Sequence, residues 1–510
     1  SLYRDVNIYY VDETNPGELV TTGIDAMLKS LDPYTVYIPE SRIEDFRFMT
    51  TGQYGGIGAM VRVIDDKVTI TEPYDGFPVQ KAGLMAGDVV IKVDEKPIDK
   101  IDDDKVTTIL KGQAGTEVKL TIKRQGLDKP MDVVLIREDI KVPDVPFYAM
   151  LDDSTGYIIL SSFTRTAYKS VYSAYKELKE QGMERLIFDL RGNGGGLLYE
   201  AVNIVNMFVP KGQLIVETKG KVKDWDKSYK ALNQPTDLSI PVIVLVNRNS
   251  ASASEIVSGS LQDIDRAVIV GETTYGKGLV QQTRDLYYNS MLKVTVAKYY
   301  IPSGRCIQKL DYAHRDDEGD VEEVPDSLLN YFETLNGRKV IDGRGIIPDV
   351  KVKIPEYSRI AYKLMENNLI FDYVTIYRSK HDSIAPAGEF SLSDEEYDDF
   401  RNWLNNQDFS YQTNTEMTYN ELIKSTKEDK CYDDIVSDLE HLKLLIEEGK
   451  QSDLDKFRPE IQQLLNNEIV SRYYYQKGRI ENVISSDPYI NKALLLFSSK
   501  QYNKILKGAS

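Results

Sequence analysis

The stretch Arg185-Leu-Ile-Phe-Asp-Leu-Arg-Gly-Asn-Gly-Gly-Gly196 decides the fold of the central part of this chain. Its first six residues form an apolar-rich run that is typical of a strand buried on both faces, and a glycine-rich turn follows. A helical run then extends from about Leu198 to Phe208. A strand, a tight turn and a helix in this order form half of a βαβ unit, which predicts a partly parallel sheet covered by helices.

The same order of elements recurs further along the chain. Pro241-Val-Ile-Val-Leu-Val246 is a second buried strand candidate, a helix is expected over about residues 254–263, and Ala267-Val-Ile-Val270 is a third strand. Residues 141–355 are therefore predicted to form a βαβ-containing core. A charge-rich excursion at 311–342 interrupts this core, and we interpret it as a solvated segment without chemistry.

Different patterns flank the predicted core. Short alternating strands broken by turns, with one helix candidate near 103–111, predict a compact module at 53–140. Apolar residues at helical spacing predict an N-terminal helical segment within 1–52, and acidic helical patterns dominate 356–510. The sequence thus predicts a multidomain α/β and α+β chain that ends in a C-terminal helical region.

Composition excludes several kinds of chemistry. The 510 residues carry 63 Lys and Arg against 80 Asp and Glu, and the net charge of −17 opposes binding to nucleic acid. Only His314, His381 and His441 are available for an imidazole base or a His-rich metal site. Cys306 and Cys431 lie far apart and indicate neither a disulfide framework nor a metal site. No apolar run approaches the ~18 residues that indicate a membrane span.

The first loop whose residues suit a functional role is Asp189-Leu-Arg-Gly-Asn-Gly-Gly-Gly196. A dinucleotide fingerprint starting at Gly192 would need a third glycine where the chain has Leu197, so that interpretation fails. What remains is a turn whose exposed backbone N–H groups suit an anion, such as the oxyanion of a tetrahedral intermediate.

The second loop is Asn249-Ser-Ala-Ser-Ala-Ser-Glu-Ile256, between a buried strand and a helix. Ser252 and Glu255 match the S-x-x-E capping box, so Ser252 as a mere helix cap is one interpretation. The other is that Ser252 is a nucleophile, because nucleophilic serines favour a sharp turn between strand and helix. The G-x-S-x-G spacing of α/β-hydrolases is absent here.

The third loop is Gly271-Glu-Thr-Thr-Tyr-Gly-Lys-Gly278. It misses the phosphate-binding P-loop pattern because Gly278 replaces the required Ser or Thr, and a strand pattern follows where a helix should. With no histidine nearby, Lys277 is the leading candidate to deprotonate a serine. Its pKa would have to fall from ~10.4 to ~7–8 for that task. Gln281 could orient the amine without adding charge.

The module at 53–140 carries two motifs that together resemble a PDZ domain of the bacterial protease-associated type. These are Tyr54-Gly-Gly-Ile-Gly58 and Pro78-Val-Gln-Lys-Ala-Gly-Leu-Met-Ala-Gly-Asp88. Converging N–H groups of a glycine-rich turn suit a terminal carboxylate, and an adjacent strand can accept an extended peptide. The residues expected at this substrate-binding turn are Tyr54, Gly55, Gly56, Ile57 and Gly58. For the glycines alone, a bulged hairpin is the alternative.

Taken together, residues 20–355 resemble the carboxyl-terminal processing proteases, relatives of tail-specific protease. The three loops and the PDZ-like module occur in the family's order, with Tyr299-Tyr-Ile-Pro-Ser-Gly-Arg-Cys-Ile-Gln308 downstream. The resemblance implies that Ser252 is the nucleophile, because the family's 25-residue step from serine to lysine lands on Lys277. It also implies an orienting role for Gln281. The implied oxyanion-hole donors are Ala253 and Gly196, with Gly195 as the second choice for the glycine.

The resemblance implies a serine endopeptidase that cuts protein substrates near exposed C-termini without metal or organic cofactor. A non-catalytic PDZ-containing scaffold on a protease-like fold is the alternative, and a nucleotide-binding enzyme is third. The resemblance also implies that the protein is extracytoplasmic, in the periplasm or at a membrane face. The start at Ser1 rather than Met leaves room for a targeting or anchoring segment ahead of it. Homo-oligomerisation through the terminal helices is a hypothesis that rests on their apolar stripes.

Overall fold

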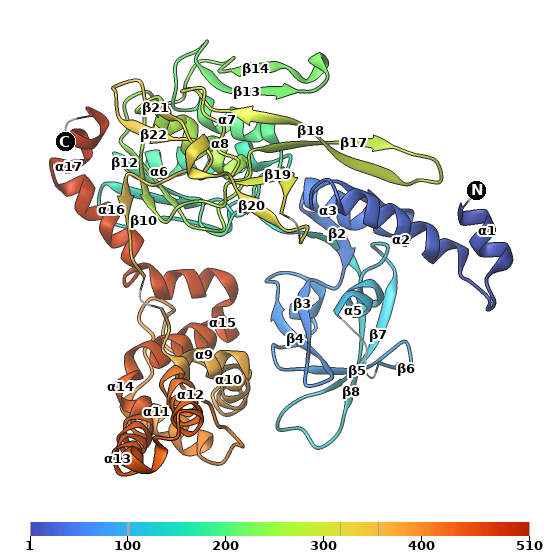
Figure 1. The fold of residues 1–510 in the computed structure, drawn as a ribbon, viewed down its shortest axis with the longest axis vertical. Coiled ribbons are helices and arrows are strands. Elements are labelled where there is room, and N and C mark those ends of the chain that lie inside the picture. The colour runs from blue at the N-terminus through green and yellow to red at the C-terminus, as the bar shows by residue number, and fades with distance from the viewer. Residues whose placement is uncertain (1, 99–102, 317, 355, 509–510) are drawn as a thin grey trace. The chain divides into compact units, whose positions relative to one another are not determined.

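The computed structural model describes residues 2–98, 103–316, 318–354 and 356–508 (Figure 1). The chain folds into two compact units, each built from segments that are distant in sequence. The first unit comprises the described residues of Ser1–Tyr54, Lys141–Lys353 and Asp487–Ser510. The second comprises those of Gly55–Ile140 and Ile354–Ser486.

A six-stranded sheet forms the centre of the first unit. Its strands in spatial order are β10 (Phe147–Met150), β11 (Thr155–Ile159), β12 (Arg185–Asp189), β15 (Val242–Val246), β16 (Val268–Gly271) and β23 (Val350–Lys351). All neighbouring pairs are parallel except β10 and β11. The predicted βαβ core and its parallel sheet are thus confirmed.

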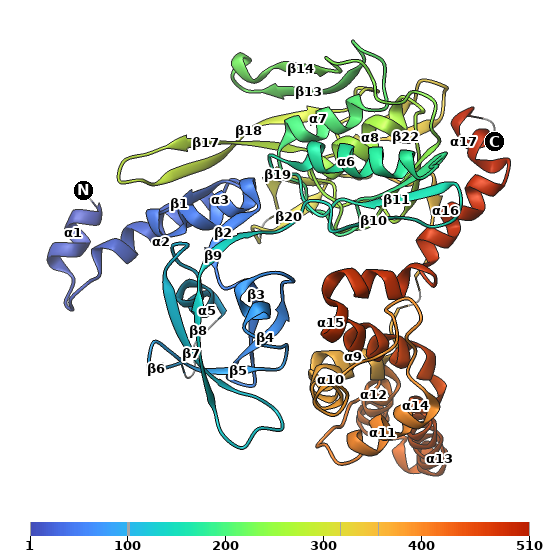
Figure 2. The same ribbon diagram turned by 180° about the vertical axis from the view of Figure 1, so that it is seen from behind.

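Three helices connect these strands and cover one face of the sheet (Figure 2). They are α6 (Ala167–Glu180), α7 (Leu198–Asn206) and α8 (Ala253–Asp263). Helix α7 contacts both α6 and α8, as expected when right-handed crossovers advance in one direction across a sheet. Val242, Val244 and Val246 of β15 belong to the core between this helical layer and the sheet.

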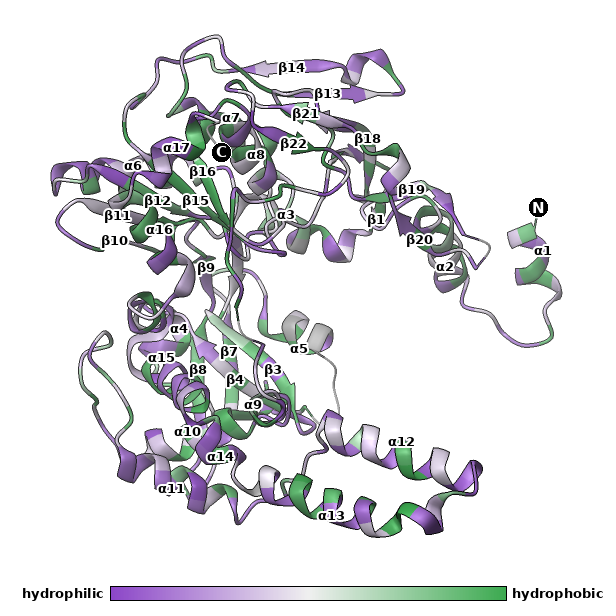
Figure 3. Cartoon of the chain, turned by 60° about the vertical axis from the view of Figure 1, so that its left-hand side comes forward, coloured by the Kyte–Doolittle hydropathy of each residue, from purple (hydrophilic) through white to green (hydrophobic). Residues whose placement is uncertain are grey.

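The opposite face of the sheet is also covered, which explains why its strands are apolar throughout (Figure 3). Ile243 and Leu245 of β15 have no exposed surface. Helix α16 (Pro488–Ser498) contacts β12, β15 and β16, and Tyr502 of α17 (Gln501–Leu506) hydrogen-bonds the backbone of Val242. These last helices, which the sequence analysis assigned to the C-terminal helical region, therefore complete the α/β core.

A second sheet and the N-terminal segment lie in the same unit. The sheet contains β1 (Val36–Ile38), β13 (Leu214–Gly220), β14 (Lys227–Lys230), β17 (Leu279–Asp285) and β18 (Met291–Tyr300). The predicted N-terminal helical segment contains α1 (Leu2–Tyr9), α2 (Pro16–Lys29) and α3 (Ile43–Thr51), besides the strand β1. The charge-rich excursion forms two hairpins, β19 (Leu310–Arg315) with β20 (Val321–Glu323) and β21 (Tyr331–Glu333) with β22 (Lys339–Ile341). Single-turn helices are η1 (Glu40–Arg42), η2 (Lys223–Trp225) and η3 (Asp326–Leu328).

The second unit contains an antiparallel sheet and a helical region. The sheet runs β3 (Ala59–Ile64), β4 (Lys67–Pro73), β5 (Val89–Val93), β7 (Glu117–Lys123) and β8 (Met131–Ile136), with β6 (Lys96–Pro97) beside β5. Helices α4 (Pro78–Lys81) and α5 (Asp103–Leu110) accompany it, and β2 (Gln53–Gly56) pairs with β9 (Glu138–Lys141). The helical region contains α9 (Arg359–Glu366), α10 (Leu369–Lys380), α11 (Asp394–Leu404), α12 (Asn414–Glu428), α13 (Tyr432–Gln451), α14 (Asp453–Lys456) and α15 (Arg458–Ile484). Among the described residues, no helix is both long and apolar enough to cross a membrane.

The covering of the sheet by α16 leads to a stability prediction. Ile490 is only 1% exposed on α16, whereas Leu495 of the same helix is 64% exposed. We expect Ile490→Ala to lower the free energy of opening of β15 by about 2–4 kcal/mol, because it leaves a cavity against the sheet. Leu495→Ala should change it by less than about 0.5 kcal/mol. Hydrogen exchange of the Val242–Val246 amides measures both, and equal effects of the two variants would contradict the placement of α16.

Candidate active site

Ser252 occupies a strained turn between β15 and α8. Its backbone angles are φ 55° and ψ −111°, which a residue with a Cβ adopts rarely. The Ser252 side chain lines a cavity of the first unit. A strained turn that presents a serine at the N-terminus of a helix is the arrangement expected of a nucleophile.

Glu255 joins the loop of Ser252 to the loop of Lys277. Its buried carboxylate accepts hydrogen bonds from the N–H groups of Ser252 at 2.8 Å, Gly276 at 2.7 Å and Lys277 at 2.9 Å, and from the Thr274 hydroxyl. Burial raises the pKa of Glu255, although these four donors act in the opposite direction. The glutamate of the predicted capping box therefore caps the helix and also positions a second loop.

Tyr299 makes a second connection between the same two loops. Its buried hydroxyl lies 2.7 Å from the carbonyl oxygen of Lys277 and 3.1 Å from that of Ser252. One phenol thus shares its proton between the backbones that carry the serine and the lysine. Since Tyr299 lies on β18, the second sheet helps to set the spacing of these two residues.

The glycine-rich loop packs directly against Ser252. A Cβ on Gly195 would lie 2.9 Å from the Ser252 Cβ, so this approach requires glycine. Asn193, which is fully buried, fixes the loop: its side chain accepts from the Gly195 N–H and its carbonyl oxygen accepts from the Ala251 N–H. Within the described residues, the N–H groups of Gly196 and Ala253 have no hydrogen-bond partner.

Lys277 has the shifted basicity that a general base requires. Burial lowers its pKa to about 8, and the charge of Lys293 acts in the same direction, against Glu255 and Asp32. The Lys277 Nζ lies 4.1 Å from the centre of the Tyr34 ring. Whereas about 0.1% of an ordinary lysine is neutral near pH 7.4, a pKa of 8 leaves roughly 20% of Lys277 neutral.

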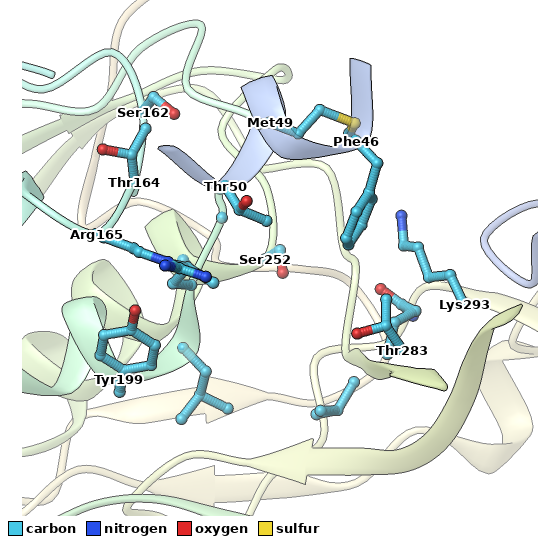
Figure 4. Close-up of a pocket in the computed structure, with 18 of the residues that line it drawn as sticks. Phe46, Met49, Thr50, Ser162, Thr164, Arg165, Tyr199, Ser252, Thr283 and Lys293 are labelled. Atoms are coloured by element: carbon cyan, nitrogen blue, oxygen red, sulfur yellow. The ribbon is translucent and has the colours of Figure 1, made fainter. Parts of the chain in front are cut away.

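Ser252 and Lys277 line one cavity of about 960 Å³. Figure 4 shows Ser252 in this cavity. The predicted oxyanion residues Ala253, Gly195 and Gly196 also line it. Gln281 lines the cavity as well, but its amide donates to the Thr295 hydroxyl at 3.2 Å. An orienting role of Gln281 toward Lys277 stays a prediction.

The glycine-rich turn of the second unit is partly engaged by the module itself. The carbonyl oxygen of Ile57 accepts from the Val79 N–H, and the Ile57 side chain is buried in the core of the module. Gly58 has a φ of 78°, and a Cβ there would overlap Phe77. Gly55 is equally constrained, because its Cβ would meet the Gly112 carbonyl oxygen at 2.1 Å. Gly56 lies in β2, while Tyr54 stacks edge to face on Phe48 in the first unit.

Sequence reasoning missed several residues of the site. Tyr34 lies in the predicted N-terminal helical segment, where no motif marks it. Lys293 lies in a strand pattern, and nothing in that pattern distinguishes it from other lysines. Tyr299 lies in the downstream motif, where a tyrosine pair was visible but its role was not. Arg165 lines the cavity and follows no motif. Of the residues that position the two loops, only Glu255 could be found from a sequence motif, the S-x-x-E capping box.

Comparisons with known proteins agree with this architecture. Residues 154–313 match the family model "Peptidase family S41", residues 55–135 match "PDZ domain", and residues 360–497 match "Probable PDZ-protease, C-terminal helical domain". A carboxy-terminal-processing protease of Bartonella bacilliformis is 37% identical over 312 residues, which cover 60% of this chain and 71% of that protein. The carboxy-terminal processing protease CtpA of Bacillus subtilis is 30% identical over 361 residues, or 71% and 69% of the two chains.

A solved structure, that of a photosystem II D1 C-terminal processing protease, is 28% identical with a TM-score of 0.38 and covers 69% of this chain and 91% of its own. The fold, the site and the matching family models define a PDZ-containing peptidase. The chain belongs to peptidase family S41, among the carboxy-terminal processing proteases.

The environment of Lys277 generates a prediction on its titration. Chemical labelling of Lys277 as a function of pH should give a pKa of about 8. Lys293→Met should raise this pKa, because removing a neighbouring positive charge lets Lys277 keep its proton to higher pH. Lys298→Met, which removes an exposed lysine of the same strand that does not line the cavity, should leave it unchanged. The labelled peptide is quantified by mass spectrometry, and an unchanged pKa in the Lys293 variant would refute the charge coupling.

Proposed function

We propose that this peptidase is a serine endopeptidase with a Ser252/Lys277 dyad, which cleaves protein substrates near their C-termini. The observation that supports the dyad most is that Ser252 and Lys277 line one cavity while the pKa of Lys277 is lowered to about 8. A serine hydroxyl needs a neighbouring base to become an effective nucleophile, and a neutral lysine is suited to that task.

In the proposed reaction the Ser252 Oγ attacks the carbonyl carbon of the scissile peptide bond and transfers its proton to the neutral Nζ of Lys277. The resulting ammonium returns this proton to the leaving amine as the peptide bond breaks. A water molecule then attacks the acyl-serine ester while Lys277 again accepts a proton, and the ammonium returns this proton to the Ser252 Oγ as the ester bond breaks and the new carboxyl group leaves. Burial favours both proton transfers from Lys277, since it disfavours the charged amine.

The oxyanion of the tetrahedral intermediate would be stabilised by the N–H groups of Ala253 and Gly196. Both lie beside Ser252 and, in the described part of the chain, neither donates elsewhere. Gly195 is less suited, because its N–H already donates to Asn193 at 2.8 Å. The N-terminus of α8 adds a favourable electrostatic contribution for a negative charge at this place.

The dyad predicts a large and specific loss of activity. Ser252→Ala and Lys277→Ala should each reduce peptide-bond cleavage by at least ~1,000-fold without unfolding the chain. Ser258→Ala, which removes a buried hydroxyl of the same helix away from the cavity, should retain activity. Cleavage of an unfolded substrate protein is followed by mass spectrometry. If Ser252 were only a helix cap, its alanine variant would stay active and lose about 1 kcal/mol of stability.

The PDZ domain has a structural feature suited to capture a substrate tail. Strand β3 lies at the edge of its sheet, where its outer backbone groups can pair with an extended peptide. Helix α5 contacts the same strand, so a peptide on β3 would lie in a groove between a strand and a helix. We therefore assign recognition of the substrate tail to β3 and to the glycine-rich turn that precedes it.

Tail capture on β3 is tested in the full-length Ser252→Ala variant with a peptide that has an apolar C-terminus. The peptide should protect the amides of Ala59–Ile64 from hydrogen exchange, whereas β8, the opposite edge of the same sheet, should be unaffected. N-methylation of alternate peptide residues should weaken binding about three- to tenfold, because each removes a backbone hydrogen bond. Equal tolerance of N-methylation at every peptide position would contradict strand addition.

A further inference from the structure

The charged residues that line the cavity at Ser252 are all basic, although the protein as a whole is strongly acidic. Three basic residues line it, Arg165, Lys277 and Lys293, and no Asp or Glu stands among its lining residues in the described chain. The chain as a whole has a net charge of −17. Such a reversal of charge at one cavity favours an anionic ligand through the local potential.

Local geometry aims Arg165 into the cavity. Its neighbours Thr164 and Thr166 both donate their hydroxyl groups to the buried carboxylate of Asp144, at 2.7 and 2.6 Å. These residues form a turn before α6, in which the Ala167 N–H donates to the Thr164 carbonyl oxygen at 3.1 Å, and Thr164 lines the cavity beside Arg165. The Arg165 N–H donates to the carbonyl oxygen of Thr50, which also lines the cavity. Figure 4 shows the Arg165 guanidinium directed toward Ser252, with Lys293 on the other side of the serine.

The guanidinium of Arg165 is left without a carboxylate. Among the described residues, no Asp or Glu lies within ion-pair distance of it. Asp144, the carboxylate that holds the neighbouring threonines, accepts hydrogen bonds from their hydroxyl groups. Arginine also keeps its charge at every pH at which a neutral Lys277 can act. It is therefore the permanent cation of the cavity.

We propose that Arg165 forms a substrate subsite for a carboxylate close to the scissile bond. This rests on the proposed function, since it takes the cavity as the place where the peptide is cut. The carboxylate is either an Asp or Glu side chain of the substrate or its free C-terminus. A planar guanidinium binds either group through paired hydrogen bonds. With both Arg165 and Ser252 on the wall of one cavity of about 960 Å³, the carboxylate lies within a few residues of the attacked carbonyl.

The test uses two series of peptides built on one cleaved sequence. In the first, a single Asp moves residue by residue across the scissile bond, and each peptide has an Asn partner. In the second, the peptide is shortened stepwise so that its free carboxylate approaches the bond, and each has a C-terminal amide partner. The full-length enzyme, Arg165→Gln and Arg165→Lys are compared. Arg248→Gln serves as a matched control, because Arg248 is exposed and does not line the cavity.

At one position in either series, the wild-type enzyme should show a KM about tenfold lower for the carboxylate peptide than for its neutral partner. Arg165→Gln should abolish that ratio while kcat changes little, Arg165→Lys should retain part of it, and Arg248→Gln should retain all of it. A preference in the Asp series assigns the subsite to acidic side chains, and one in the shortened series assigns it to the C-terminus.

Two results would overturn the proposal: no position with such a preference, or an equal loss for charged and neutral peptides in Arg165→Gln, as a merely structural role would give. The same ratios are measured as binding by fluorescence polarisation with Ser252→Ala and Ser252→Ala/Arg165→Gln. Because binding needs no turnover, a wrong assignment of the dyad would leave this test of Arg165 intact. Any contribution of the PDZ domain is common to both variants and cancels in their ratio.

Discussion

The candidate active site depends on the hydrogen bonds that the buried carboxylate of Glu255 accepts. This carboxylate accepts the N–H groups of Ser252 and Lys277, so a single side chain sets the spacing of the serine and lysine loops. Tyr299 repeats this connection through the carbonyl oxygens of the same two residues. A buried carboxylate is costly unless it is fully hydrogen-bonded, and here four donors meet that condition. The proposed nucleophile and base are thereby positioned through their backbones, which leaves their side chains available for chemistry.

The cost of burying cations explains the second property of the site. Lys277 and Lys293 both have a lowered pKa because burial disfavours their charged forms, and the charge of Lys293 further lowers the pKa of Lys277. The cavity therefore contains two amines whose charged forms are disfavoured, Lys277 and Lys293, and one guanidinium, that of Arg165. Burial thus acts on Lys277, whereas Arg165 is exposed on the wall of the same cavity.

The sheet that supports these loops is buried on both faces, and its two covers come from distant parts of the sequence. Helices α6, α7 and α8 follow their strands directly, so their positions follow from the chirality of βαβ connections. Helix α16 returns to the sheet after the whole helical region of the second unit, and Ile490 packs against it. A run of apolar strand residues predicts that both faces of the sheet are covered. It does not predict which segment covers the second face, because the spacing of apolar residues says nothing about contacts between distant segments.

The sequence by itself determined the α/β core, the PDZ module and the candidates Ser252 and Lys277, because strand and helix periods and short loop motifs are local properties. The tertiary structure decided how these loops meet: which glycine N–H stays available, which residues depress the basicity of Lys277, and that Arg165 enters the same cavity. These properties depend on burial and on contacts between residues far apart in the chain. They arise only when β18, the N-terminal segment and the glycine-rich loop converge on the carboxyl ends of the parallel strands.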